Sequence, residues 1–245
     1  MTTVVISQPM YFPWGGFFEL LSCADIYVHL DDVQFSKGGF TNRVQIKQPN
    51  GITWMTIPLV DKGTFKEIRR LEAAIPDFRQ RHRDLLRQAL RNAPYLDHAL
   101  ELFDTVMRRE ALSDMLMASV EEPAKRLGIR TPSQWLVTSQ LDLPGRSSSR
   151  VLDIVKHVGG TRYVTAHGAA NYLDHEGFEA AGVAVDYIDY SRTPYPQLHG
   201  GFTPYVSVLD LVANTGAESG RYLHARTKPW RTFLAERKSA EATHE

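Results

Sequence analysis

Polar side chains crowd two short segments near the start of the chain. One follows the apolar run Val4–Ile6 and contains Gln8, and the other follows the apolar run Ile26–Leu30 and begins with Asp31 and Asp32. A carboxylate in such a place can accept a proton or hold an amine, and an amide can orient a polar substrate. The spacing therefore indicates a binding or catalytic site built from the ends of two strands.

The patterns around these segments have the order of a βαβ unit. Pro9 and Pro13 disfavour helix in the first polar segment, so a helix is expected no earlier than about Trp14, with apolar residues at helical spacing from Phe17 to Ala24. Ligands of open parallel sheets bind beyond the carboxyl ends of the strands. We therefore expect both polar segments at that edge of the sheet.

A β-hairpin is predicted next, because the runs 42–47 and 52–59 flank a Pro-Asn-Gly turn. Alternation along its first strand sets Arg43 and Lys47 on one face. We expect these two cations, with Lys37, to hold a phosphate or carboxylate, and a solvated strand face is the alternative. Residues 76–128 have helical patterns, and the strand and helix patterns of an α/β protein return from about residue 135.

His167 follows the strand predicted at 161–165 and precedes a glycine. Acid–base residues often lie at such strand ends, although a structural histidine is an equal alternative. The catalytic candidates are Asp31, Asp32 and His167. Because adjacent residues of a strand point to opposite faces, only one of the two aspartates is expected to face a ligand. A Ser-rich basic turn at 145–150 opens a further helix, either as a cap or as a phosphate cradle.

The substrate-binding candidates are polar or aromatic residues that we expect around one shared pocket. They are Gln8, Tyr11, Trp14, Gln34, Lys37, Asn42, Arg43, Lys47, Tyr195 and Gln197. The alternative for most of the aromatic residues is the core. A structure that places Gln8 and Arg43 on opposite sides of the sheet would contradict the hypothesis of a single site.

Composition limits the class of protein. The 245 residues carry 28 basic and 28 acidic side chains, a balance that gives no support for nucleic-acid or membrane partners, so a small-molecule substrate is expected. The single cysteine, Cys23, excludes an internal disulfide, and no CxxC metal pattern is present. The sequence leaves the identity of any cofactor open. No signal peptide or transmembrane run is recognised, and the cytoplasm is the expected location.

The segment QPMYFPWGGFFELLSCADIYVHLDDVQFSKGGFTNRVQIK resembles the signature of the WbqC-like family, and the similarity returns in the last third of the chain. The positions that match the family pattern are Gln8, Pro9, Tyr11, Pro13, Trp14, Asp31, Asp32, Gln34, Lys37, Asn42, Arg43, Lys47, Tyr195, Gln197, Phe202, Ser207 and Asp210. His167 departs from the pattern, which more often has a small residue there. The resemblance implies a role in O-antigen, other surface-polysaccharide or natural-product biosynthesis, with aminoacyl or glycine transfer attached to some members.

A second resemblance concerns the fold. The proline-aromatic turn, helix and strand that follow the first strand look like the Rossmann-like layout of nucleotidylyltransferases, which pantothenate synthetases share. The paired histidines of their HxGH motif are missing here, where Trp14-Gly15-Gly16-Phe17 stands. We therefore expect one Rossmann-like α/β domain over 1–235, with a mainly parallel sheet, a helical subdomain at about 76–128 and a frayed tail at 236–245.

Three functions are compatible with these features. The first is a transferase that joins an acyl or aminoacyl group to the amine of a nucleotide-sugar or similar intermediate. Asp31 or Asp32 would be the base, and a carrier protein is a possible partner that delivers the donor. The second is Mg²⁺-assisted group transfer on a phosphorylated substrate, with Asp31, Asp32 and Gln34 as ligands. The third is a non-catalytic binding or assembly protein of a biosynthetic cluster.

Overall fold

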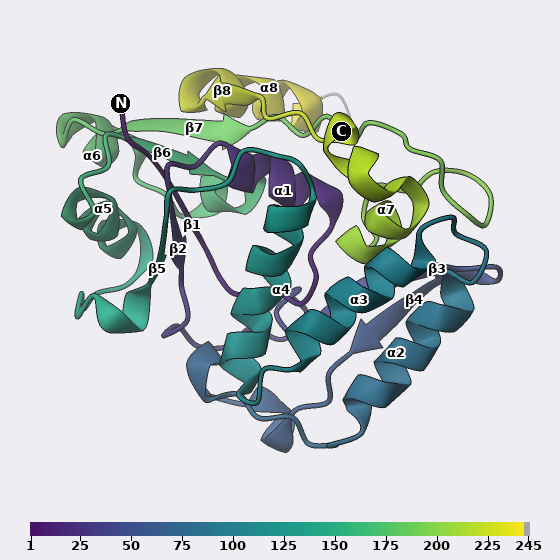
Figure 1. Cartoon of the computed structure of the whole chain (residues 1–245). Helices are drawn as coiled ribbons and strands as arrows, with labels where there is room; N and C mark the ends of the chain where they lie inside the picture. The colour runs from purple at the N-terminus through teal and green to yellow at the C-terminus, as the bar shows by residue number, and fades with distance from the viewer. Residues whose placement is uncertain (243–245) are drawn as a thin grey trace.

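A six-stranded sheet forms the centre of the computed structural model, which describes residues 1–242 (Figure 1). The strands are β1 (Thr3–Ser7), β2 (Ile26–His29), β5 (Gln134–Val137), β6 (Arg162–Thr165), β7 (Ala184–Ile188) and β8 (Thr227–Pro229). Their order is β5-β2-β1-β6-β7-β8, and every pairing is parallel except that of β7 with β8. The predicted α/β fold with a mainly parallel, Rossmann-like sheet is confirmed.

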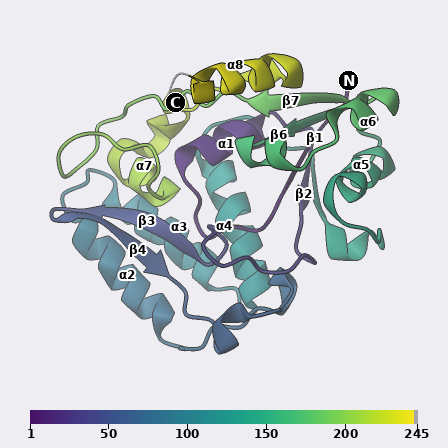
Figure 2. The same ribbon diagram turned by 180° about the vertical axis from the view of Figure 1, so that it is seen from behind.

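Alternate residues of the strands face two separate hydrophobic layers. Val5 and Tyr27 belong to the core on one face, and Val4 and Val28 belong to the core on the other. Helices α1 (Gly15–Ser22) and α4 (Leu112–Arg126) cover the first face, whereas α5 (Ser147–His157) and α6 (His175–Ala180) cover the second (Figures 1 and 2). Helix α8 (Trp230–Ala242) packs against β7. Burial on both faces explains why the strands are nearly continuous apolar runs.

The middle of the chain forms the predicted insertion. The antiparallel hairpin of β3 (Arg43–Gln48) and β4 (Gly51–Thr56) precedes α2 (Phe78–Ala89), α3 (Leu96–Met107) and α4. Helix α3 also packs against α7 (Val208–Thr215) near the end of the chain, which ties the insertion to the last third of the sequence. Short 3₁₀ helices complete the chain at Val60–Gly63, Ile68–Arg70, Thr138–Gln140, His167–Asn171 and Gly216–Tyr222.

Helix α1 begins at Gly15, as the two prolines before it predict. Trp14 precedes the helix in an extended conformation, and its ring lies over Gly16. A Cβ atom at Gly16 would lie only 2.2 Å from that ring, so only glycine fits there. Gly16 therefore serves the packing of Trp14 against the helix.

The N–H groups of the 3₁₀ helix Ile68–Arg70 bond locally and to the Asp31–Val33 segment. One local prediction differs from the structure. The tail expected to be frayed over 236–245 continues α8 as far as Ala242, and 243–245 lie outside the described residues. None of the helices within 1–242 has the length and apolar character required to cross a membrane.

Candidate functional site

The carboxyl ends of β1 and β2 lie side by side, since Ser7 pairs with His29 in the parallel register. The chain moves outward from β1 through β2 to β5 and then returns to the other side of β1 for β6 and β7. In doubly wound sheets, ligands bind outside the carboxyl ends of the strands near such a change of direction. Both predicted polar segments lie at this edge.

A cavity of about 500 Å³ opens at this edge, between the ends of β1 and β2 and the start of α5. We call it the α5 pocket. Its polar side chains are Gln8, Asp32, Gln34, Arg146, Arg150 and Tyr172, and Leu30, Val33, Val151 and Ile154 supply apolar walls. A volume of several hundred cubic ångströms and a few convergent polar groups are typical of small-molecule sites.

Asp31 does not line the α5 pocket. The residue is 3% exposed, and its carboxylate accepts hydrogen bonds from the Ser139 backbone N–H (3.0 Å) and the Ser139 hydroxyl (2.7 Å). The Thr138 hydroxyl, whose single proton is shared with Asp32, lies 3.1 Å from the same carboxylate. These bonds fasten the end of β2 to the segment after β5. Because Asp31 is buried and does not line the pocket, the prediction that it acts as a catalytic base or a metal ligand is corrected to a structural role.

Asp32 is the aspartate that faces the pocket, as expected for one of two adjacent residues. Arg150 donates a hydrogen bond of 2.6 Å to its Oδ2, and the Thr138 hydroxyl lies 2.8 Å from its Oδ1. Burial raises the pKa of Asp32, but the bonds from Arg150 and Thr138 and the charge of Arg150 outweigh it and lower the pKa overall. Each carboxylate oxygen keeps a second lone pair, so the ionised group can still bind a ligand donor.

The start of α5 adds donors to the pocket. Residue Arg146 precedes the helix with an extended backbone, and no side chain caps the helix there, although the Ser-rich turn made capping the first expectation. Ser149 instead donates to the Arg146 carbonyl, and Ser148 accepts from the Asp174 N–H. Uncapped N–H groups at the start of an eleven-residue helix favour an anion. Because Arg146 and Ser147 line the pocket, this favourable end of α5 lies in its wall.

Three predicted substrate-binding residues bond with one another instead. Lys47 is 5% exposed, and its Nζ donates to Gln197 Oε1 (2.9 Å) and the Gly201 carbonyl (2.6 Å). Gln197 donates to Asp210 Oδ1 (3.0 Å), and the Tyr195 hydroxyl donates to the same atom (2.7 Å). This network fastens the loop around residues 195–203 to β3 and α7. The expectation that Lys47, Tyr195 and Gln197 hold a ligand is corrected, since their polar atoms are already engaged.

Substitution of Lys47 by methionine is expected to lower the free energy of unfolding by about 2 kcal/mol, because the charge-assisted bonds that this buried ammonium group donates to Gln197 and Gly201 are lost. Urea denaturation measures the effect. The matched control is Lys66→Met, since Lys66 makes only a loose surface ion pair with Glu72 at 3.7 Å. Equal destabilisation by the two variants would contradict the anchoring role of Lys47.

The two aromatic candidates near β1 serve packing. Tyr11 is fully buried, and its hydroxyl lies 2.9 Å from His82 Nδ1, so it is corrected from a pocket residue to a core residue. Trp14 packs against Tyr190 and Tyr205 with ring centroids at 4.8 and 5.3 Å. Trp14 and Tyr195 line a cavity of about 20 Å³, which is too small for a substrate.

A different cavity holds the cationic candidates of the hairpin. Lys37, Asn42 and Arg43 line a space of about 350 Å³ beside β3 and β4, which we call the hairpin cavity. The backbone between the two cavities is held in place, since the Phe35 N–H donates to the Lys66 carbonyl (2.8 Å). Gln8 and Arg43 line separate cavities, so the structure does not bring these two candidates into one shared pocket.

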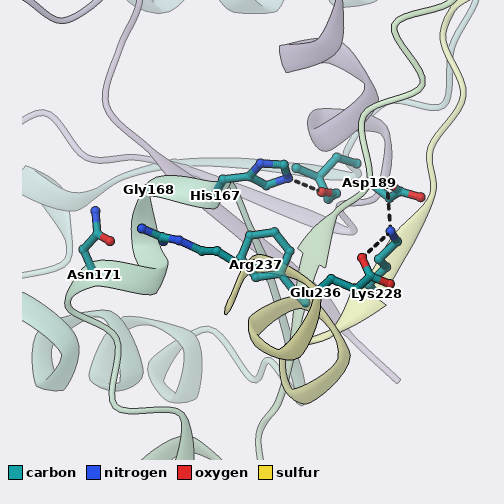
Figure 3. Close-up of a pocket in the computed structure, with 9 residues that line it drawn as sticks. His167, Gly168, Asn171, Asp189, Lys228, Glu236 and Arg237 are labelled. Carbon is teal, nitrogen blue, oxygen red and sulfur yellow. Dashed lines mark hydrogen bonds and ion pairs between the residues drawn. The ribbon is translucent and has the colours of Figure 1, made fainter. Parts of the chain in front are cut away.

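His167 belongs to a third cavity of about 540 Å³ at the carboxyl ends of β6 and β7, beneath α8 (Figure 3). Its Nε2 donates to the Ile188 carbonyl at 2.8 Å. Lys228 in the same cavity bonds to Glu236 (2.8 Å) and Asp189 (3.5 Å). His167 therefore lies outside the cavity of Asp32, and a catalytic role for it stays a prediction about this third cavity.

Tyr172 was absent from the sequence candidates, and Arg146 and Arg150 were considered only as part of the Ser-rich turn. The signal for both arginines was that turn, which follows β5, and β5 is the neighbour of β2 in the sheet. Tyr172 follows the predicted end of β6 by a few residues, and no pattern marks it. Within residues 1–242, no group of three or more His, Cys, Asp or Glu side chains is arranged to hold a metal ion.

Comparison with known proteins gives the relatives of the chain. The sequence model of the WbqC-like protein family matches residues 8–222, a range that contains every residue of the α5 pocket. A protein of Mycobacterium tuberculosis (strain ATCC 25618 / H37Rv), described as "Uncharacterized protein Rv1507c", is 30% identical over 230 residues, which cover 91% of this chain and 98% of that relative. No solved structure was found to match. With most of its length matched, including the polar edge of the sheet, the chain belongs to the WbqC-like protein family.

Proposed function

We propose that the protein is a small-molecule transferase that joins an acyl or aminoacyl group to an amine of a nucleotide-sugar or similar anionic intermediate in polysaccharide or natural-product assembly. The observation that carries the proposal is the α5 pocket. It combines an ionised carboxylate with two side-chain amides, a free arginine and the start of a helix, at the ligand-binding edge of a parallel sheet.

The anionic part of the substrate would lie at the α5 end of the pocket. Arg146 makes no side-chain hydrogen bond or ion pair to any other part of the described chain, so its guanidinium is available for a phosphate. The uncapped first turn of α5 adds backbone donors. Arg150 contributes positive charge, but its bonds to Asp32 and the Leu143 carbonyl fix it in place. This division gives Arg146 the direct contact and Arg150 a positioning role.

The amine of the substrate would face Asp32, and the amides of Gln8 and Gln34 would orient polar groups around it. In the transfer, the amine nitrogen bonds to the acyl carbon, the donor's leaving group departs with the electron pair of its bond, and the nitrogen loses a proton. The nitrogen is positively charged at that stage and therefore acidic. A carboxylate of lowered pKa, such as that of Asp32, can accept such a proton.

Product formation tests the proposal. The purified protein is incubated with amine-bearing nucleotide-sugars and a panel of acyl-CoA and aminoacyl donors, and mass spectrometry follows the mass gain of an amide. We expect product with the wild type, a loss of kcat/KM of about tenfold or more in Arg146→Gln, and a larger loss in Asp32→Asn. Lys66→Gln, which lies outside the pocket, should retain wild-type activity.

Tight binding of a nucleotide-sugar without turnover by any donor would contradict the transferase proposal and favour a non-catalytic binding protein. Turnover that Asp32→Asn and Arg146→Gln leave unchanged would place the reaction outside the α5 pocket.

A further inference from the structure

The hairpin cavity is lined by three cationic side chains and by no acidic one. Lys37, Arg43 and Lys62 supply the positive charge, and no aspartate or glutamate belongs to the lining within residues 1–242. The other two large cavities described above contain carboxylates, Asp32 in one and Asp189 and Glu236 in the other. An uncompensated cluster of three cations around a concave surface creates a positive potential that attracts an anion.

The two lysines are free to bind. Neither Lys37 Nζ nor Lys62 Nζ makes a hydrogen bond or ion pair with the rest of the chain that the structure describes. Asp61, the neighbour of Lys62, likewise forms no ion pair among these residues. Both ammonium groups therefore keep all their N–H donors for a ligand.

Arg43 is fixed in position. Its Nη2 donates to the Gly38 carbonyl (2.6 Å), its Nε donates to the Gly39 carbonyl (3.2 Å), and its guanidinium lies 4.2 Å from the centre of the Trp54 ring. These contacts hold the guanidinium at the cavity and leave Nη1 unused. A positioned arginine beside two free lysines is a suitable arrangement for an anion with several oxygen atoms.

The rest of the lining suits an organic group attached to the anion. Phe35, Ile57, Pro58 and Leu59 form apolar walls. Asn42 donates from Nδ2 to the Ile57 carbonyl at 2.9 Å, so its Oδ1 remains available as an acceptor for a hydroxyl group. The volume of about 350 Å³ lies within the range of small-molecule sites.

The backbone at Lys62 is strained. Asp61 and Lys62 have φ angles of 51° and 55°, in the left-handed region that non-glycine residues seldom occupy. The following Gly63 also has a positive φ, and a Cβ there would lie within 3.0 Å of Phe35, Leu59 and Leu71. Strained backbone of this kind persists only where the surroundings hold it, and it is frequent at ligand sites.

We infer that the hairpin cavity is a second ligand site, which binds the phosphate or diphosphate group of a small organic molecule. A phosphate monoester carries about 1.5 to 2 negative charges at neutral pH and three acceptor oxygens, which match the three cations better than a single carboxylate does. The inference does not rest on the function proposed for the α5 pocket, because the two cavities share no lining residue.

Isothermal titration with inorganic pyrophosphate tests the inference in three proteins: the wild type, the double variant Lys37→Gln/Lys62→Gln, and Arg146→Gln. The double variant should fold normally, because neither lysine has a partner among the described residues. Arg43 stays unchanged because its bonds to the backbone are structural. We expect the double variant to bind pyrophosphate about tenfold or more weakly at the hairpin cavity, and added salt to weaken wild-type binding.

Retention of pyrophosphate binding in Arg146→Gln would support a site separate from the α5 pocket. The wild type could instead bind two pyrophosphate molecules, one in each cavity. In that case a fall to one molecule in each variant would support the inference equally. Absence of pyrophosphate binding in the wild type at low salt would overturn the inference. Binding that the double variant keeps and Arg146→Gln loses would also overturn it, while leaving the proposal for the α5 pocket intact.

Discussion

Substitution of Arg150 by alanine is expected to lower the free energy of unfolding at neutral pH by about 3 kcal/mol. The Arg150–Asp32 ion pair is largely shielded, with side chains 10% and 16% exposed. Removal of the guanidinium leaves the Asp32 carboxylate in this environment with only Thr138 as a partner. Leaving one charge of a buried pair uncompensated typically costs several kcal/mol, whereas exposed pairs contribute little.

The pH dependence of this effect follows from Asp32. Its folded-state pKa is lowered, so the stabilisation is present above the ordinary carboxylate pKa of about 4 and is lost as the pH falls through the lowered value. Urea denaturation should therefore show that the difference in free energy of unfolding between the wild type and Arg150→Ala is large at pH 7 and becomes smaller in acid. Asp32→Asn in the Arg150→Ala background should recover part of the loss, and a gap that is independent of pH would contradict this origin.

Acid is expected to destabilise the protein through His82, by about 3 kcal/mol between pH 6.5 and pH 4. Burial disfavours the imidazolium and lowers the pKa of His82 from 6.5 to about 4, although the bond to the Thr56 carbonyl opposes this shift. The neutral ring accepts a bond from the Tyr11 hydroxyl (2.9 Å) and donates one to Thr56 (3.2 Å). The unfolded chain binds the proton at a higher pH than the folded chain does, so stability is full above pH 6.5 and falls below it.

His82→Gln removes the titrating group and tests this expectation. Urea denaturation should show that the variant is less stable than the wild type at pH 7. Its free energy of unfolding should fall much less than that of the wild type between pH 6.5 and pH 4. His175, whose pKa is also lowered by burial, accounts for part of the remaining slope. His157 is an exposed histidine, so His157→Gln should keep the wild-type slope. An unchanged slope in His82→Gln would show that another group is responsible.

Local sequence patterns predicted the first helix and the first two strands of the sheet. Pro9 and Pro13 set the start of α1, and apolar runs set β1 and β2, so the meeting of Gln8 and Asp32 at one edge followed from the rule for parallel strands. The alternation of adjacent residues also predicted that one aspartate would face a ligand and the other would not. These inferences depend only on neighbours in sequence.

The errors concern contacts between residues far apart in sequence. Lys47 has the character of a phosphate-binding residue, yet its partner Gln197 lies 150 positions away, and nothing local shows that the two bond. Tyr11 stands in the same motif as Gln8 but bonds to His82 in the insertion. Arg146 and Arg150 join the site because β5 lies beside β2, and strand order is a property of the whole sheet.

A thermal-shift measurement tests the α5 pocket most directly. The wild type, Arg146→Gln and Lys37→Gln/Lys62→Gln are melted with and without each member of a panel of nucleotide-sugars. A ligand at 100 times its Kd adds about 2.7 kcal/mol of stability, which a melting curve resolves. We expect at least one nucleotide-sugar to raise the Tm of the wild type, and the rise to be lost in Arg146→Gln. A rise that persists in Arg146→Gln would contradict the assignment of the substrate to the α5 pocket, and so would the absence of a rise with every nucleotide-sugar.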